Sequence, residues 1–128
     1  PCIYYGSEWG IKGKKNWNDT QLRPEIQEWK WNGLTDILQK LIQLKHTHSS
    51  LSYGDYTQIA INNTACIYQR QDETECLWIC MNMKSEEQTL GFNGCGTFVD
   101  LNTNQTITIQ NCLAFKPYEI KVLKRSSD

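Results

Sequence analysis

The sequence lacks the charge excess and the long apolar runs that mark two large classes of protein. Its 13 lysine and arginine residues are balanced by 14 aspartate and glutamate residues, so we do not expect the basic surface of a nucleic-acid-binding protein. No apolar run approaches the roughly 18 residues that span a bilayer, and no charged-then-apolar signal peptide opens the chain. We therefore predict neither a nucleic-acid partner nor a membrane partner.

The length and the first residue bear on how the chain is organised. A chain of 128 residues can bury a core of its own, as one domain or as a domain with a remnant of another. It begins with proline rather than methionine, so we expect it to be cut from a longer protein. Glycosylation sequons occur at Asn18, Asn62 and Asn104, but nothing else indicates secretion, and we expect a cytoplasmic protein.

The six cysteines could form a disulfide framework, but their context favours free thiols. Cys66, Cys76 and Cys80 lie among isoleucine, leucine, tryptophan and tyrosine, where free cysteine behaves as a small apolar residue. Cys76 and Cys80 are four apart on a predicted strand, hence ~13 Å apart at ~3.3 Å per residue, too far to chelate one ion. We predict reduced core cysteines. A disulfide-stabilised secreted domain is the alternative, which a count of free thiols would test.

One amphipathic helix is predicted over residues 33–47. Its apolar residues recur at helical spacing, and Asp36 near its start and Lys45 near its end suit the helix dipole. These apolar residues are Leu34, Ile37, Leu38, Leu41, Ile42 and Leu44. His46 and His48 are two residues apart and so lie on different faces of a helix, and we assign them no metal-binding or catalytic role.

From Tyr53 onward, short β-prone runs alternate with turn residues, a pattern typical of antiparallel sandwiches and barrels. Strands are predicted at 55–61, 64–70, 75–82, 87–92, 96–101, 105–109 and 116–124. Residues 71–74 join two strands as a hairpin, Asn93-Gly94 is a turn dipeptide, and Asn104 lies in a turn where asparagine can adopt a positive φ. The predicted fold class is mainly β: a C-terminal antiparallel β-sandwich of Greek-key type, against which helix 33–47 packs its Leu/Ile face.

The opening of the chain is predicted to be a buried strand that leads into a long loop. Ile3, Tyr4 and Tyr5 are β-branched or aromatic, and Gly6 ends the run. Residues 6–32 form an irregular stretch much longer than ordinary loops, and such a stretch is usually functional or disordered. Four of the five tryptophans lie in or beside it, which argues against disorder.

Several motifs occur together in an order that is similar to a known family. The chain opens with Pro-Cys-Ile-Tyr-Tyr-Gly-Ser-Glu, its loop contains Asn18-Asp19 and Leu22-Arg23-Pro24, and Tyr-Gly-Asp-Tyr follows the helix. Residues 99–104 are similar to an Asp-Leu-x-Thr-Gly turn with Asn104 in place of glycine. The chain resembles the C-terminal end of alpha-amylase family glycoside hydrolases, in particular the bacterial alpha-amylase, cyclomaltodextrinase and neopullulanase branch.

The resemblance implies two domains and a reaction. Residues 1–51 would be the C-terminal remnant of a (β/α)8 catalytic barrel, and residues 52–128 the β-sandwich domain that follows it. The parent would be a retaining glycoside hydrolase acting on alpha-glucans such as starch, maltooligosaccharides and cyclodextrins. Its catalytic carboxylates would lie upstream of Pro1, so we assign no catalytic residue, cofactor or metal to this chain and expect the chain alone to be inactive.

The resemblance also implies that residues 6–32 lie at the active-site face of the barrel and form one wall of its cleft. Arg23 offers a rigid five-donor fork to sugar hydroxyls or a carboxylate. A structural salt bridge is an equal alternative for Arg23, and the same two interpretations hold for Asp19. Trp9 and Trp17 present flat faces on which a glucose ring can rest. Spacing along a loop cannot establish the ~5–5.5 Å separation of a retaining carboxyl pair, so Glu8 and Asp19 are not predicted to be one.

The remaining residues of interest receive structural assignments. We expect Tyr5 and Glu8 to be buried at the exit of the first strand, Trp29 and Trp31 to pack the helix, and Trp78 to lie in the core. The alternative function is a non-catalytic carbohydrate-binding β-sandwich module with an N-terminal linker. A linker would be rich in proline, glycine or serine, which the strand-like opening and the tryptophan-rich loop do not fit.

Overall fold

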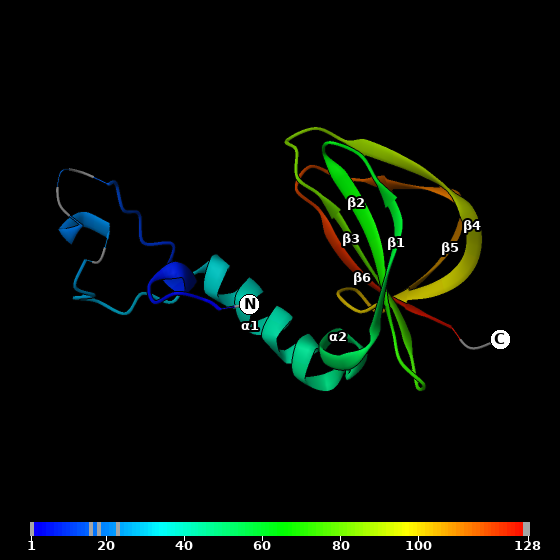
Figure 1. The fold of residues 1–128 in the computed structure, drawn as a ribbon, viewed down its shortest axis with the longest axis horizontal. Coiled ribbons are helices and arrows are strands. Elements are labelled where there is room, and N and C mark those ends of the chain that lie inside the picture. The colour runs from blue at the N-terminus through cyan, green and yellow to red at the C-terminus, as the bar shows by residue number, and fades with distance from the viewer. Residues whose placement is uncertain (1, 16, 18, 23, 127–128) are drawn as a thin grey trace. The chain divides into compact units, whose positions relative to one another are not determined.

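The computed structural model describes residues 2–15, 17, 19–22 and 24–126 of the chain (Figure 1). Two compact units are present, Pro1–Thr47 and His48–Asp128. The division falls between residues 47 and 48, whereas the sequence placed it between 51 and 52. Among the described residues, no helix combines the length and the apolar character needed to cross a membrane.

Among its described residues, the first unit contains one regular helix and two short turns of 3₁₀ helix. The turns are η1 (Ser7–Trp9) and η2 (Thr20–Leu22), and the helix is α1 (Gly33–Thr47). The predicted helix over 33–47 is therefore confirmed. Three of its apolar residues, Leu34, Ile37 and Ile42, are exposed, and the packing of this face against the sandwich stays a prediction.

The predicted strand at the start of the chain is wrong. Residues 2–4 have no regular structure and Tyr5 begins a turn, in which the Ser7 amide donates to the Tyr4 carbonyl at 3.0 Å. A strand is held by hydrogen bonds to a neighbouring strand, and the first unit has no strand among its described residues. Ile3, Tyr4 and Tyr5 are consequently exposed, so the predicted burial of Tyr5 is also wrong.

The second unit is a six-stranded antiparallel sheet in the order β1-β2-β3-β6-β4-β5. A short helix, α2 (Ser50–Tyr53), precedes it. The strands are β1 (Asp55–Ile61), β2 (Ala65–Gln71), β3 (Cys76–Asn82), β4 (Gln88–Asp100), β5 (Gln105–Phe115) and β6 (Ile120–Arg125). Because β6 inserts between β3 and β4, the last connection crosses over, as in Greek-key sheets.

Six strands replace the seven that the sequence predicted. The segments predicted at 87–92 and 96–101 are one strand, β4, and Asn93-Gly94 lies inside it rather than in a turn. The pairing of β4 with β5 shifts register between Gly91 and Cys95, so the turn dipeptide forms a bulge instead. A bulge absorbs extra residues without ending the strand, which explains why the local turn signal was misleading.

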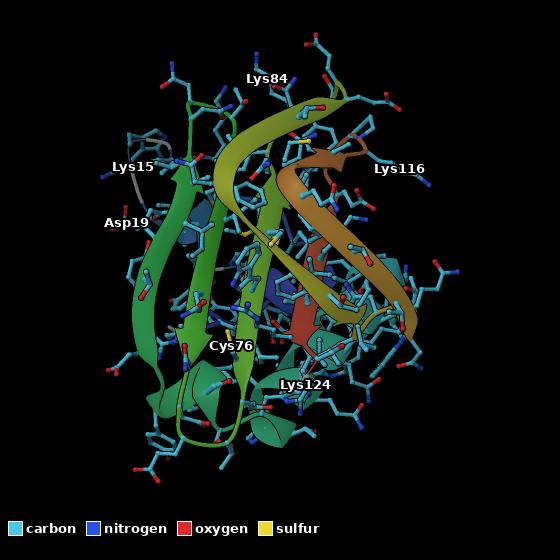
Figure 2. The ribbon with its side chains drawn as sticks, turned by 90° about the vertical axis from the view of Figure 1, so that its right-hand side faces the viewer. Lys15, Asp19, Cys76, Lys84, Lys116 and Lys124 are labelled. Carbon is cyan, nitrogen blue, oxygen red and sulfur yellow. The ribbon has the colours of Figure 1, made fainter. Side chains whose placement is uncertain are left out.

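The sheet curls so that its two halves face each other across the core (Figures 1 and 2). The Trp78 ring of β3 packs against Phe98 and Phe92 of β4, with centroid distances of 4.6 and 5.5 Å. Its Nε1 donates to Gln69 Oε1 at 3.0 Å, so the buried indole is satisfied. The predicted sandwich and the core position of Trp78 are confirmed, and the two layers belong to one hydrogen-bonded sheet.

The cysteines are free thiols, as predicted. Cys66 and Cys80 are buried in the sheet and Cys76 is half-buried, whereas Cys2, Cys95 and Cys112 are exposed. Burial raises the pKa of the Cys80 thiol to about 12, because the charged thiolate is poorly solvated there. The core cysteines therefore act as apolar residues and not as nucleophiles.

The turn between β4 and β5 shows the backbone conformation that the sequence predicted. Asn104 has a φ of 58°, and its amide donates to the Asp100 carbonyl at 2.7 Å. We predict that Asn104→Ala lowers the free energy of unfolding by about 1–2 kcal/mol, because alanine pays the steric cost of a left-handed residue. Asn104→Gly is the matched control and should unfold at a urea concentration close to that of the parent. Equal stability of the alanine and glycine variants would contradict the prediction.

Candidate functional site

The long loop of the first unit is anchored at both ends by the start of α1. The Asn32 side chain caps the helix, accepting from the amides of Leu34 and Thr35 at 2.9 and 3.3 Å. Its Nδ2 donates to the Trp9 carbonyl at 3.1 Å, and Thr35 Oγ1 donates to the Glu8 carbonyl at 2.8 Å. The polar residues that begin the helix thus also hold η1, residues 7–9, in position.

Trp9 of η1 packs with two other tryptophans, Trp29 and Trp31. We call these three residues the tryptophan cluster. The Trp29 and Trp31 rings approach the Trp9 ring edge-on, with centroid distances of 5.7 and 6.3 Å. Trp31 Nε1 also donates to Asp36 Oδ1 at 2.6 Å. Both outer rings are largely exposed, 70% for Trp29 and 59% for Trp31. We expected both rings to pack on the helix. Among the described residues, only Trp31 is hydrogen-bonded to α1, through Asp36, and both rings pack against Trp9 instead.

Two polar atoms beneath the cluster are buried without a hydrogen-bond partner among the described residues. They are Glu8 Oε2 and Trp9 Nε1, neighbours in sequence on η1. Buried polar atoms are nearly always paired in folded proteins, because an unpaired one costs the desolvation free energy of the group. Glu8 Oε2 and Trp9 Nε1 are therefore an open acceptor and an open donor on adjacent residues of the described chain. Trp9 is half-buried, and its predicted contact with a sugar ring stays a prediction.

The other predicted sugar-binding residues lie further along the loop. Trp17 is 92% exposed, and Asp19 is exposed with its carbonyl accepting the Leu22 amide at 3.0 Å. Arg23 lies outside the described residues. Within the part of the chain that the structure describes, no hydrogen bond or ring contact joins Trp17 or Asp19 to the tryptophan cluster. The structure therefore leaves the loop with two separate groups of candidate residues.

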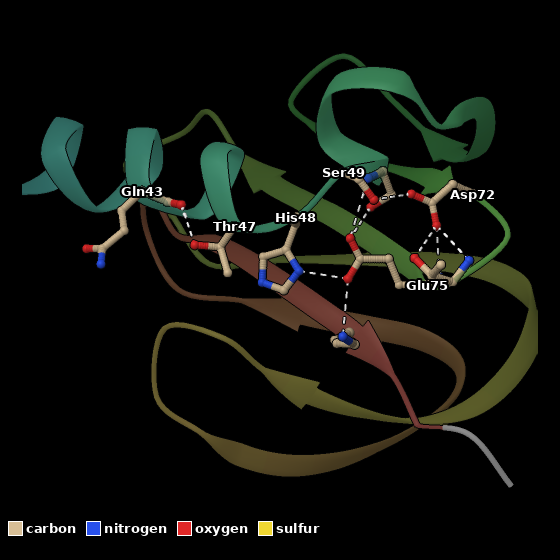
Figure 3. Close-up of polar contacts among 9 residues, drawn as sticks. Gln43, Thr47, His48, Ser49, Asp72 and Glu75 are labelled. Carbon is tan, nitrogen blue, oxygen red and sulfur yellow. Dashed lines mark hydrogen bonds and ion pairs between the residues drawn. The ribbon is translucent and has the colours of Figure 1, made fainter.

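The most connected charged cluster in the second unit centres on Glu75 (Figure 3). Its Oε2 is 2.7 Å from His48 Nδ1 and 3.1 Å from Lys124 Nζ, and its Oε1 accepts from Ser50 Oγ at 2.9 Å. Only 6% of the Glu75 side chain is exposed. The cluster joins the segment before α2 to the β2–β3 hairpin and to β6, and both carboxylate oxygens are occupied by donors.

A second carboxylate, Asp72, lies next to this cluster. We call the cluster of His48, Ser49, Ser50, Asp72, Glu75 and Lys124 the Glu75 joint. Asp72 Oδ2 accepts from Ser49 Oγ at 2.5 Å, and Oδ1 accepts from the amides of Thr74 and Glu75 at 2.8 and 3.0 Å. These hydrogen bonds, with the Ser49 bond largest, hold the pKa of Asp72 well below its usual range. The Asp72 and Glu75 contacts hold the hairpin turn and the start of the second unit in place, which is a structural role and not a catalytic one.

The sequence analysis assigned His48 no metal-binding or catalytic role, and it did not foresee the contact of His48 with Glu75. His48 finds Glu75 across 27 positions of the chain, a separation at which no local pattern reports a contact. Among the described residues, no group of three or more histidine, cysteine or acidic side chains could hold a metal ion. Neither this joint nor the loop therefore presents a metal site within the described part of the chain.

Comparison with known proteins relates both the sequence and the fold to one family. No protein-family model matches the chain. It is 30% identical over 91 residues, 70% of its length, to the cyclomaltodextrin glucanotransferase of Bacillus sp. (strain 1-1). An Anoxybacillus alpha-amylase matches the fold over 98% of this chain with a TM-score of 0.83 and 19% identity. The resemblance to the C-terminal part of alpha-amylase family enzymes is confirmed.

The alpha-amylase family likeness covers only part of each relative. The chain spans 12% of the length of the Bacillus transferase and 28% of the Anoxybacillus amylase. A third relative, AmyP, was solved in complex with maltose, and it is matched over 73% of this chain and 21% of its own at a TM-score of 0.64 and 24% identity. Much of an alpha-amylase family enzyme therefore has no counterpart in these 128 residues.

The Glu75 joint generates a pH prediction. Burial alone would raise the pKa of Glu75, but the hydrogen bonds from His48, Ser50 and Lys124 outweigh burial and lower it. A carboxyl with a lowered folded pKa stabilises the fold above its unfolded pKa of about 4.3, and this stabilisation is lost as the pH falls through the folded value. We predict that Glu75→Gln lowers the free energy of unfolding by about 1–3 kcal/mol at neutral pH.

The measurement is urea unfolding of both proteins at several pH values. The difference between parent and Glu75→Gln should stay constant above about pH 5 and shrink as the pH falls from there towards about pH 3, because the parent alone loses the charged interaction. Glu73→Gln is the matched control, since it removes an acidic residue from the same hairpin turn, at an exposed position. A difference that is independent of pH would show that the carboxylate charge does not stabilise the joint.

Proposed function

We propose that the chain is the C-terminal part of a retaining glycoside hydrolase that acts on alpha-glucans. The observation that supports this most is the extent of the family likeness, because the fold shared with the Anoxybacillus alpha-amylase covers 98% of the chain, loop and helix included. A carbohydrate-binding module with an unrelated linker would share only its sandwich. In this proposal the first unit is a remnant of a (β/α)8 barrel and the parent is cytoplasmic.

The proposed role of the loop over residues 6–32 is to form one wall of the substrate cleft. Trp17 offers an almost fully exposed ring, which suits stacking against the apolar face of a glucose unit. Trp29 and Trp31 expose further aromatic surface beside the unpaired donor and acceptor of Trp9 and Glu8. The complex of AmyP with maltose supports an oligosaccharide of glucose as the ligand class for this chain.

The proposed role of the sandwich is to stabilise the parent. Its core residues are almost fully inaccessible, and the Glu75 joint ties the start of the unit to its hairpin. The catalytic carboxylates belong, in this proposal, to barrel strands upstream of Pro1. In the second unit, Glu75 and Asp72 are occupied by structural hydrogen bonds, so neither suits the part of a nucleophile or an acid.

A second candidate function is a carbohydrate-binding β-sandwich, and one observation favours it. Tyr56 on β1 and Tyr68 on β2 pair with a centroid distance of 5.4 Å, and the Tyr56 ring is 56% exposed. Adjacent aromatic rings on strands can form a platform for a sugar. The test is electrophoresis of the chain in gels that contain starch. This second function is favoured if the starch retards the chain and if Tyr56→Ala, but not Trp17→Ala, abolishes the retardation.

We predict that the 128-residue chain has no glycosidase activity by itself. The reason is that a retaining reaction needs a nucleophile and an acid about 5–5.5 Å apart, and in this proposal both belong to barrel strands upstream of Pro1. The pure chain is assayed on maltooligosaccharides and cyclodextrins. If the pure chain shows no turnover, the result supports the proposal. If it shows turnover that is abolished by Glu8→Gln or Asp19→Asn, the catalytic pair lies in the loop.

In the full-length parent, Arg23→Ala should act mainly through KM. A residue that binds ground state and transition state equally raises KM when it is lost and leaves kcat unchanged. Losing a charged hydrogen bond costs about 1.5–3 kcal/mol, so kcat/KM should fall on the order of ten- to a hundred-fold. Trp17→Ala should be milder and, because this ring is exposed, should leave stability unchanged.

Cys66→Ala is the control for these kinetic measurements. Cys66 is buried in β2 of the sandwich, so its replacement should lower the melting temperature without altering kcat or KM. If Arg23→Ala instead left kcat/KM within about twofold of the parent and reduced only stability, the structural salt-bridge interpretation of Arg23 would be the better one.

A further inference from the structure

Two exposed cysteines lie on neighbouring strands of the curled sheet. Cys95 belongs to β4 and Cys112 to β5, which pair antiparallel. Both thiols are free and exposed. The other cysteines of the second unit, Cys66, Cys76 and Cys80, are buried or half-buried in the sheet, so accessible thiols in this unit are confined to this one place.

The register of the two strands shows that the two side chains share a face. Cys95 is paired with Gln110, and Cys112 is paired with Gly91. Paired residues of an antiparallel sheet point to the same side, and so do residues two apart on one strand. Cys112 therefore lies on the same face as Cys95, one diagonal position away, while the alternating residues Ile109 and Leu113 face the core.

The irregular part of the β4–β5 pairing lies between the two cysteines. Between the pairs Gly91–Cys112 and Cys95–Gln110, three residues of β4 oppose one residue of β5. Diagonal neighbours in a regular sheet are about 7–8 Å apart, slightly beyond the Cα separation of about 4.4–6.8 Å that a disulfide spans. The shift needed is about 1–2 Å, and bulged segments bend and twist more than regular ladder does.

A side-chain carbon added at the glycines of the bulge would make only ordinary van der Waals contacts. A Cβ added at Gly91 would meet no atom nearer than 3.9 Å, and one added at Gly94 would meet none nearer than 3.7 Å. The opposite strand carries Asn111, whose φ of 58° departs from the strand region. The regular pairing of β4 with β5 is therefore interrupted on both strands, between Cys95 and Cys112.

We propose that Cys95 and Cys112 form a reactive dithiol that closes to an intramolecular disulfide when the protein meets a low-molecular-weight disulfide such as oxidised glutathione. One cysteine gives up its proton and attacks the reagent disulfide, forming a mixed disulfide and releasing one reduced reagent thiol. The second cysteine gives up its proton and attacks the protein-bound sulfur, releasing the other reagent thiol. The two protein thiols are oxidised and one reagent disulfide is reduced.

The closed disulfide would act as a redox-responsive latch across the bulge. It would tie the edge strand β5 to β4 at the point where their hydrogen-bonded ladder is weakest. A cross-link stabilises mainly by restricting the unfolded chain, so the oxidised protein should melt at a higher temperature than the reduced one, by about 10 °C. In a reducing environment the same pair remains a dithiol.

The chain contains its own reference thiol, Cys2, which is exposed and stands alone in the first unit. A lone exposed thiol can only retain the glutathionyl group that it acquires. The test is to treat the full chain with oxidised glutathione and to map the products by mass spectrometry after proteolysis. We expect Cys2 to carry a glutathionyl group, and the Cys95 and Cys112 peptides to be joined, with two hydrogen atoms lost and no glutathionyl group retained.

The single variants Cys95→Ser and Cys112→Ser provide the matched controls. Because the second step is intramolecular, the mixed disulfide should not accumulate in the parent. In each variant the remaining thiol should accumulate it at least about ten-fold more than in the parent. Glutathionyl groups that persist on both cysteines of the parent, or equal adduct levels in parent and variants, would overturn the proposal. The parent's peptide map decides the question even if a variant fails to fold.

Discussion

The insertion of β6 between β3 and β4 is the constraint on which the sandwich depends. Leu123 of β6 is paired with Trp78 of β3 and with Asp100 of β4, and it is fully buried. Without this last strand, the β1-β2-β3 part and the β4-β5 hairpin would share no ladder. The long-range pairing of β6 therefore closes the sheet around the core that Trp78 and Phe98 fill.

In each unit, polar side-chain contacts hold one segment in position: η1 in the first unit and the segment around Glu75 in the second. In the first unit, Asn32 and Thr35 serve both as the cap of α1 and as the anchor of η1. In the second unit, Glu75 contacts His48 from the segment before α2, Ser50 of α2 and Lys124 of β6. Each contact satisfies polar groups that burial would otherwise leave unpaired. The exception among the described residues is η1 itself, where Glu8 and Trp9 each keep one buried polar atom without a hydrogen-bond partner.

How far the sequence predicts the structure depends on how local the determining interaction is. The helix over 33–47 was predicted residue for residue, because its apolar spacing and the glycine at its start are properties of neighbouring residues. The positive φ of Asn104 follows from the same kind of local preference. The opening strand was wrong because a strand exists only through its neighbours, and the Asn93-Gly94 turn was wrong because pairing with β5 kept β4 continuous.

By itself the sequence determined the fold class, the helix, the buried thiols of Cys66 and Cys80 and the family resemblance. These features follow from apolar periodicity and short motifs, which depend only on residues close together in the sequence. Only the tertiary structure decided which strands pair, that the two layers are one sheet, and that His48 meets Glu75. It also brought Cys95 and Cys112 onto one face across a bulge. These features depend on contacts between residues far apart in the chain, and such contacts form only when the whole core is assembled.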